Sequence, residues 1–174
     1  MARQIVLLRG INLGSTRRVS MPKLREILED AGFGDVQTYV QSGNVVLSTN
    51  KPPKQTARAV EKLIKQHFGL DVPVVARTKG EVAAVVKANP FEEAVKDPKR
   101  YQVTFYEEAP NSKLIRKLDE VAVPEEKLAH NGREIYAWHP AGVARSKLWN
   151  EIARTKGTSR NWTTVAKLLE LAGG

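Results

Sequence analysis

The sequence contains no cysteine at all. This absence excludes a thiol nucleophile, a disulfide, an iron–sulfur site and any zinc site built on thiolates. Long hydrophobic runs are missing too, because the N-terminal apolar run covers only residues 5–8, too short for a signal peptide or a membrane span. We therefore expect a soluble, cytoplasmic protein that does not enter a membrane.

Catalytic and metal-binding patterns are equally scarce. The histidines, His67, His130 and His139, lack the spacing of a metal site, and no G-x-S-x-G motif indicates a serine hydrolase. The acidic pairs at 92–93, 107–108 and 125–126 are interpreted as surface charges, because adjacent side chains point in different directions. Phosphate-loop and dinucleotide-binding motifs are absent. The sequence thus predicts no metal and no cofactor, and it indicates no reaction.

Basic residues are in excess in this chain of 174 residues. There are 28 Lys and Arg against 19 Asp and Glu, which gives a formal net charge of +9. The excess lies in residues 1–87 and 133–174, whereas 88–132 is slightly acidic. Clustered basic side chains attract polyanions, so phosphate-bearing partners are favoured, with a merely solubilising surface as the alternative.

The order of periodic segments predicts a ferredoxin-like first domain, residues 1–78. The expected elements are a strand at 4–9, a helix capped by Ser20, a hairpin of strands 36–41 and 45–48, a helix ended by Gly69 and a strand at 72–77. This order, βαββαβ, is that of the ferredoxin-like fold.

The second domain, residues 79–174, is predicted to be a related βαββα half with an extra C-terminal helix. The expected elements are a helix at 81–88, a strand at 100–107, a helix at 112–121, a hairpin of 127–130 and 133–138, and helices at 145–154 and 162–171. The predicted fold class is therefore α+β, with two ferredoxin-like α/β sandwich halves.

Four separated segments carry a family resemblance. They are Arg9-Gly10-Ile11-Asn12-Leu13-Gly14, Gln41-Ser42-Gly43-Asn44-Val45, Asn89-Pro90-Phe91 and Thr158-Ser159-Arg160-Asn161-Trp162. In this order they resemble the bacterial domain-of-unknown-function 1697 family, over nearly the whole chain. The resemblance implies two similar α+β subdomains and no established activity.

The loop at residues 9–18, called loop 9–18 below, carries groups suited to an anion. Arg9, the Asn12 amide, the Ser15 hydroxyl and Arg17 lie around two glycines. Backbone N–H groups and guanidinium groups in such a loop can bind a phosphate or a carboxylate. In the alternative interpretation the glycines only provide tight turns.

Residues 158–162 are expected to form a loop before the last helix, where unpaired N–H groups favour an anion. Arg160 and Asn161 would bind that anion, and Trp162 would offer a stacking surface. The alternative is a helix cap at Asn161 beside a core tryptophan.

The turn at residues 41–44 and the second helix provide further candidate binding residues. Ser42 and Asn44 are included as ligand-binding candidates, although residues 41–44 also have the composition of a simple turn. The second helix carries a basic stripe of Lys54, Arg58, Lys62 and Lys65, which suits either nucleic-acid phosphates or solvent.

Our leading hypothesis is a binding module for a phosphate-bearing ligand, small molecule or nucleic acid, at the junction of loop 9–18 and the last helix. Arg9, Asn12, Arg160 and Asn161 are expected to converge on one exposed pocket. Any nucleic-acid binding should be weak and independent of base sequence. The alternatives are an enzyme of unassigned reaction, with Arg9 and Arg160 stabilising charge, and a structural or interaction protein without a ligand.

Overall fold

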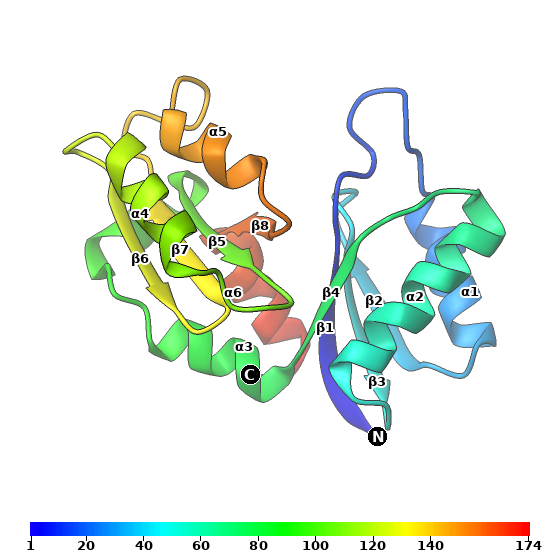
Figure 1. The fold of residues 1–174 in the computed structure, drawn as a ribbon. Helices are drawn as coiled ribbons and strands as arrows, with labels where there is room; N and C mark the ends of the chain where they lie inside the picture. Colours follow the sequence, from blue (N-terminus) through cyan, green and yellow to red (C-terminus); the bar gives the residue numbers. More distant parts are fainter. The chain divides into compact units, whose positions relative to one another are not determined.

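The computed structural model describes every residue from Met1 to Gly174. The chain forms two compact units, one of Met1–Ala84 with Lys167–Gly174 and one of Val85–Ala166 (Figure 1). The boundaries between them fall inside two helices, α3 (Lys79–Lys87) and α6 (Trp162–Leu171). The domain division predicted from the sequence, 1–78 and 79–174, stays a prediction.

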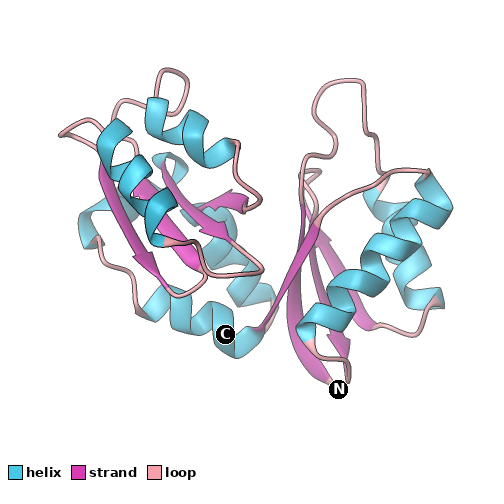
Figure 2. Ribbon diagram, viewed as in Figure 1, coloured by secondary structure: helices cyan, strands magenta, loops and turns pink.

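The first unit has a four-stranded antiparallel sheet with two helices on one face (Figure 2). Its main elements are β1 (Ala2–Leu8), α1 (Met21–Asp30), β2 (Gly34–Tyr39), β3 (Asn44–Thr49), α2 (Pro53–Phe68) and β4 (Val74–Thr78). The strand order is β2-β3-β1-β4, and all three pairings are antiparallel. This is the ferredoxin-like arrangement predicted from the sequence.

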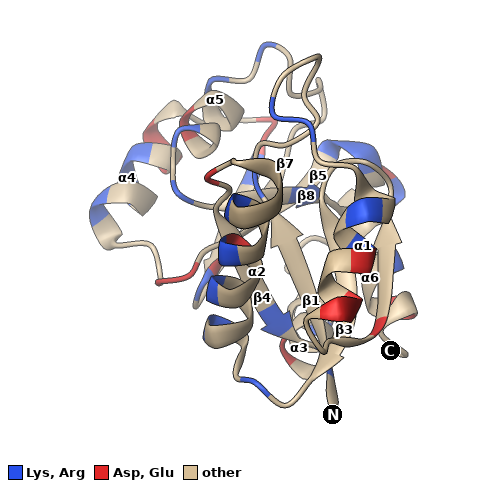
Figure 3. Cartoon of the chain, turned by 90° about the vertical axis from the view of Figure 1, so that its right-hand side faces the viewer, with Lys and Arg blue, Asp and Glu red and all other residues tan.

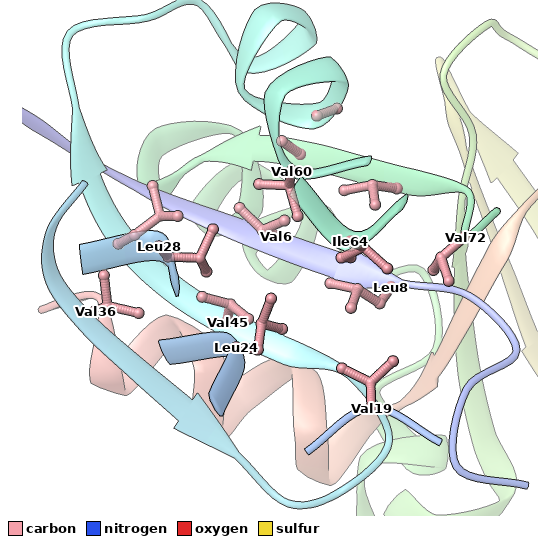
Figure 4. Packing of buried hydrophobic residues seen from close by; sticks show 14 of the residues in the cluster. Val6, Leu8, Val19, Leu24, Leu28, Val36, Val45, Val60, Ile64 and Val72 are labelled. Carbon is pink, nitrogen blue, oxygen red and sulfur yellow. The ribbon is translucent and has the colours of Figure 1, made fainter. Parts of the chain in front are cut away.

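Local signals explain where the helices of the first unit begin and end. The Ser20 hydroxyl accepts the Lys23 N–H at the start of α1, and Gly69 ends α2 with a φ of 70°. Alternate residues of the sheet, such as Val6 and Val45, pack against the apolar faces of both helices (Figure 4).

Both ends of loop 9–18 are fixed in this same core. Leu8 precedes the loop and Val19 follows it, and both belong to the buried cluster (Figure 4). Ile11, within the loop, belongs to the same cluster. The loop therefore leaves and re-enters a rigid scaffold.

The second unit repeats the topology. Its elements, with the helices that flank it, are α3, η1 (Glu92–Lys96), η2 (Pro98–Arg100), β5 (Tyr101–Phe105), α4 (Ser112–Val121), β6 (Lys127–Asn131), β7 (Glu134–Trp138), α5 (Lys147–Ala153), β8 (Thr158–Asn161) and α6. The strand order β6-β7-β5-β8 matches that of the first sheet element for element. The predicted fold class of two similar α+β halves is confirmed.

One detail of the second half differs from the prediction. The segment expected as a loop before the last helix is the strand β8, which pairs with β5 through Val103 opposite Arg160 and Phe105 opposite Thr158. With only four residues and no apolar alternation, β8 has no periodic signal of its own, so only its pairing reveals it. The second unit is a complete βαββαβ.

No helix in the chain is both long and apolar enough to span a bilayer.

Candidate functional site

Loop 9–18 is an ordered turn with unusual backbone angles. Four of its residues have positive φ: Gly10 (66°), Asn12 (55°), Gly14 (69°) and Arg17 (52°). Glycine adopts this conformation freely and asparagine tolerates it, whereas it is uncommon for arginine. The Asn12 N–H donates to the Arg17 carbonyl at 3.0 Å, and Leu13 and Thr16 form a β-bridge above it. The loop is thus folded back on itself.

The Asn12 side chain holds this turn in place. Its Nδ2 donates to the carbonyls of Val19 at 2.9 Å and Gln41 at 2.7 Å, and its Oδ1 accepts the Val19 N–H at 2.8 Å. Both amide N–H groups are therefore used inside the fold. This geometry supports a positioning role for Asn12 rather than direct contact with a ligand.

Arg17 and Arg18 of the loop bond to main-chain oxygens. Arg17 donates from Nε to the Gly10 carbonyl at 2.8 Å and from Nη2 to the Asp71 carbonyl at 2.7 Å. Arg18 donates from Nη1 to the Gly14 carbonyl at 3.2 Å. Both side chains are exposed, and neither bonds to a carboxylate, so their positive charge is not neutralised by the protein. Ser15 is exposed on the same turn.

The hairpin turn between β2 and β3 lies against the loop. The Leu8 N–H donates to the Gly43 carbonyl at 2.8 Å, and the Gln41 carbonyl accepts a hydrogen bond from Asn12 Nδ2. Val40, exposed and β-branched, has a φ of 52°, which is a strained conformation for such a residue. The structure thus brings together two of the sequence segments singled out above.

Asn44 is a structural residue of this turn. It is fully buried, and its Nδ2 donates to the Tyr39 carbonyl at 3.1 Å and the Ser42 hydroxyl at 2.9 Å. Ser42 is exposed. Of these two candidates, only Ser42 lies where a ligand can reach it.

A shallow hollow of about 270 Å³ lies beside the loop, lined by Glu61, Asp71, Val72 and Pro73. Two hydrogen bonds connect it to the loop: the Arg9 N–H donates to the Pro73 carbonyl at 3.0 Å, and the Arg17 guanidinium donates to the Asp71 main-chain carbonyl at 2.7 Å. Its two carboxylates disfavour an anion there. An anion is better placed at the exposed arginines than in the hollow.

The remaining candidates belong to the second unit. The Asn161 Oδ1 accepts the Thr164 N–H at 2.9 Å and so caps α6. Trp162 is only 7% exposed and stacks on Tyr101, with ring centroids 5.0 Å apart. Arg160 donates to the Ser159 carbonyl at 2.9 Å, and burial lowers its pKa to about 10. Convergence of these residues with Arg9 and Asn12 stays a prediction.

The basic stripe on α2 is partly neutralised. Arg58 pairs with Glu61, and Lys65 lies 3.3 Å from the Asp71 carboxylate. Figure 3 shows the positions of basic and acidic residues along this helix. Tyr136, on the neighbouring strand β7, offers no stacking surface for bases because it is buried.

A polar cluster that the sequence did not reveal lies inside the second unit. His139 is fully buried, and the Glu126 side chain is 6% exposed. Glu126 Oε2 lies 2.6 Å from His139 Nδ1 and accepts the Ser146 hydroxyl at 2.6 Å, while its Oε1 accepts the Val123 N–H at 3.2 Å. The interpretation of Glu126 as a surface charge is therefore wrong. Its partners lie 13 and 20 residues away and meet it only once the sheet has formed.

This cluster does not have the geometry of a hydrolase triad. In a triad the serine bonds to one ring nitrogen and the acid to the other. Here Ser146 and Glu126 both approach Nδ1, with the hydroxyl 3.1 Å from it. Elsewhere, no three His, Asp or Glu side chains lie together in a way that could hold a metal ion.

Comparisons with known proteins agree with this fold. The conserved bacterial protein SP0830 from Streptococcus pneumoniae has a similar structure, with a TM-score of 0.82, 21% identity and 98% of each chain covered, a likeness that shows the fold alone. No curated protein is significantly similar in sequence. A family model described as "Protein of unknown function (DUF1697)" matches residues 1–136. Since this match covers well over half of the chain, the chain belongs to the DUF1697 family.

Proposed function

We propose that the chain is a binding module for a phosphate-bearing ligand, a small molecule or a nucleic acid, and that loop 9–18 binds the phosphate. The observation that carries the proposal is the loop itself. It is exposed and basic, yet it is held in one conformation by the Asn12 amide.

The fixed conformation of loop 9–18 favours binding because the loop is preorganised. A loop that is already ordered loses little conformational entropy when it binds a ligand, so its charge-assisted hydrogen bonds contribute more to affinity. Strained residues such as Arg17 and Val40 persist only where the surrounding structure imposes them, and such residues cluster at ligand-binding sites. Arg18 and Ser15 supply donors on the exposed side.

The test is a thermal-shift screen of the full chain with inorganic phosphate, pyrophosphate, nucleoside phosphates and short oligonucleotides. A ligand present at 100 times its dissociation constant, and bound only to the folded form, stabilises the protein by about 2.7 kcal/mol. Arg18→Ala should reduce the affinity of any hit by about tenfold, because one charge-assisted contact is lost.

Arg25→Ala is the matched control, since Arg25 is an exposed arginine of the same unit that pairs with Glu29 on α1. It should leave the affinity unchanged. A hit weakened equally by both substitutions would indicate general electrostatic attraction instead. If no phosphate compound stabilises the protein, the alternative of an interaction protein without a ligand is favoured.

A further inference from the structure

Loop 9–18 and the turn at residues 40–43 form a surface that projects from the first unit. Residues 13–18 are all exposed, and the loop extends beyond the end of β1 (Figure 1). The hollow beside it is lined by the carboxylates of Glu61 and Asp71, which disfavour an anion. Small ligands bind in concave sites that cover most of their surface. A projecting loop instead suits a large ligand that surrounds it.

Two aliphatic side chains are exposed on this surface. Leu13 is 70% exposed and Val40 is 52% exposed, and the only other exposed large apolar side chain of the first unit is that of Met1. Leu13 directly follows Asn12 in the sequence. Val40 directly precedes Gln41, whose carbonyl accepts the Asn12 amide, so the two backbone positions lie on the same surface. The two exposed aliphatic residues favour a ligand with some apolar surface.

The charge of this surface is positive. Arg17 and Arg18 donate to main-chain oxygens and not to a carboxylate, and a guanidinium has more N–H donors than these bonds use. Exposed hydroxyls lie on the same surface, from Ser15, Thr16 and Ser42. Cationic and hydroxyl side chains of this kind bind phosphate and sugar oxygens in nucleic acids. The hydrocarbon of a membrane, by contrast, would bury these hydroxyls without a hydrogen-bond partner.

The shape of the loop discriminates between nucleic-acid duplexes. The Asn12 N–H donates to the Arg17 carbonyl at 3.0 Å. A β-bridge joins Leu13 to Thr16, so the two arms of the loop form a narrow ribbon. The major groove of B-form DNA, about 12 Å wide, admits a two-stranded ribbon between its rows of phosphates. The major groove of an RNA duplex is too deep and narrow for side chains to read.

Single-stranded nucleic acids need a different kind of surface. Proteins bind them chiefly by stacking the bases on exposed aromatic rings in a basic groove. Residues 9–18 and 40–43 contain no aromatic residue. Apolar side chains in the major groove instead contact the methyl group of thymine, and Leu13 is suited to such a contact. The composition of the surface thus favours a duplex over a single strand.

We propose that loop 9–18 enters the major groove of double-stranded DNA, with Leu13 against the base edges and Arg17 and Arg18 on the flanking phosphates. This inference rests on the proposed function, because it names the phosphate-bearing ligand of the same loop. Phosphate contacts carry no sequence information, so the loop binds DNA with little preference for base sequence. Each phosphate contact releases counterions, which makes the affinity fall as the salt concentration rises.

Fluorescence anisotropy of a labelled DNA duplex of about 20 base pairs, titrated with the full chain at several salt concentrations, tests the proposal. Arg18→Ala should lower the affinity and reduce the slope of log K against log salt by about one, because one phosphate contact is lost. Leu13→Ser should lower the affinity about fivefold and leave the slope unchanged, because only an apolar contact is lost. Val123→Ser removes an exposed aliphatic side chain of the second unit and is the matched control, which should change neither quantity.

An RNA duplex and a DNA single strand of the same sequence should bind at least about tenfold more weakly than the DNA duplex at the same salt concentration. Equal binding of either, or an unchanged affinity of Leu13→Ser, would overturn the inference. If inorganic phosphate or nucleotides stabilise the chain but the duplex does not bind, the proposed function stands and the DNA inference fails. Binding of anionic phospholipid vesicles in place of the duplex would assign the surface to a membrane and also overturn it. If none of these ligands binds, the proposed function fails as well.

Discussion

The Asn12 side-chain amide donates to the carbonyl of Gln41, 29 residues away in sequence, at 2.7 Å. This bond joins the loop after β1 to the turn between β2 and β3. Two segments that are separate in the sequence therefore form one surface.

Asn12→Ala should lower the free energy of unfolding by about 2 kcal/mol, because three hydrogen bonds are lost and the Val19 N–H loses its acceptor. Urea unfolding followed by circular dichroism measures the change. Ser15→Ala, at an exposed position of the same loop, should change it by less than about 0.5 kcal/mol. Equal effects of the two substitutions would show that the Asn12 amide does not hold the loop.

Gly43→Ala should be more damaging than an ordinary turn substitution. Gly43 has a φ of 95°, and an added Cβ would lie 2.7 Å from the Leu8 Cβ. Overpacking and backbone strain together should cost roughly 3 kcal/mol. Gly132→Ala is the matched control, since its φ is 60° but nothing lies within 4 Å of the added Cβ. That change should cost only about 1 kcal/mol in the same unfolding experiment.

The second unit should lose stability in strong alkali through its buried tyrosines. Burial, with a smaller effect of Glu134, raises the pKa of Tyr136 to about 12, and burial also raises the pKa of Tyr101. A raised pKa contributes stability below the ordinary value of about 10 and loses it as the pH rises through the folded value. In a pH titration of the folded chain followed by the ultraviolet absorbance of phenolate, Tyr101 and Tyr136 should therefore ionise at higher pH than a tyrosine in solvent.

The chain unfolded in guanidinium provides the reference for that titration, because its four tyrosines should ionise together near the ordinary value. Tyr101 and Tyr136 should ionise only as the circular dichroism of the sheet is lost. Ionisation of all tyrosines near pH 10 with the sheet intact would contradict the burial argument.

The fold was largely predictable because most elements carry their own local signals. The Ser20 cap and the Gly69 stop mark element ends in the sequence and do so in the structure. The hairpin predicted from strands 127–130 and 133–138 is present, but its turn lies at Gly132 and Arg133, because Asn131 still pairs with Glu134. The strand β8 was not predictable, since its four residues acquire strand character only from pairing with β5.

The roles of the candidate site residues were not predictable from the sequence. Residue type alone placed Asn12 and Asn44 among the ligand-binding candidates, because an amide that binds a ligand and one that binds the main chain look alike in a sequence. Their partners, at Gln41 and Tyr39, exist only in the folded turn. The interpretation of Glu126 as a surface charge was wrong for the same reason, since its partners are His139, directly after β7, and Ser146, the N-cap of α5.

Because the two sheets have the same strand order, equivalent connections in the two units can be compared directly. In the second unit, the link from the first strand to the first helix runs over residues 106–111. In the first unit, the equivalent link runs over residues 9–20, about twice the length. The shorter link connects the same two elements, so the additional residues that carry the arginines are not required to join the first strand to the first helix.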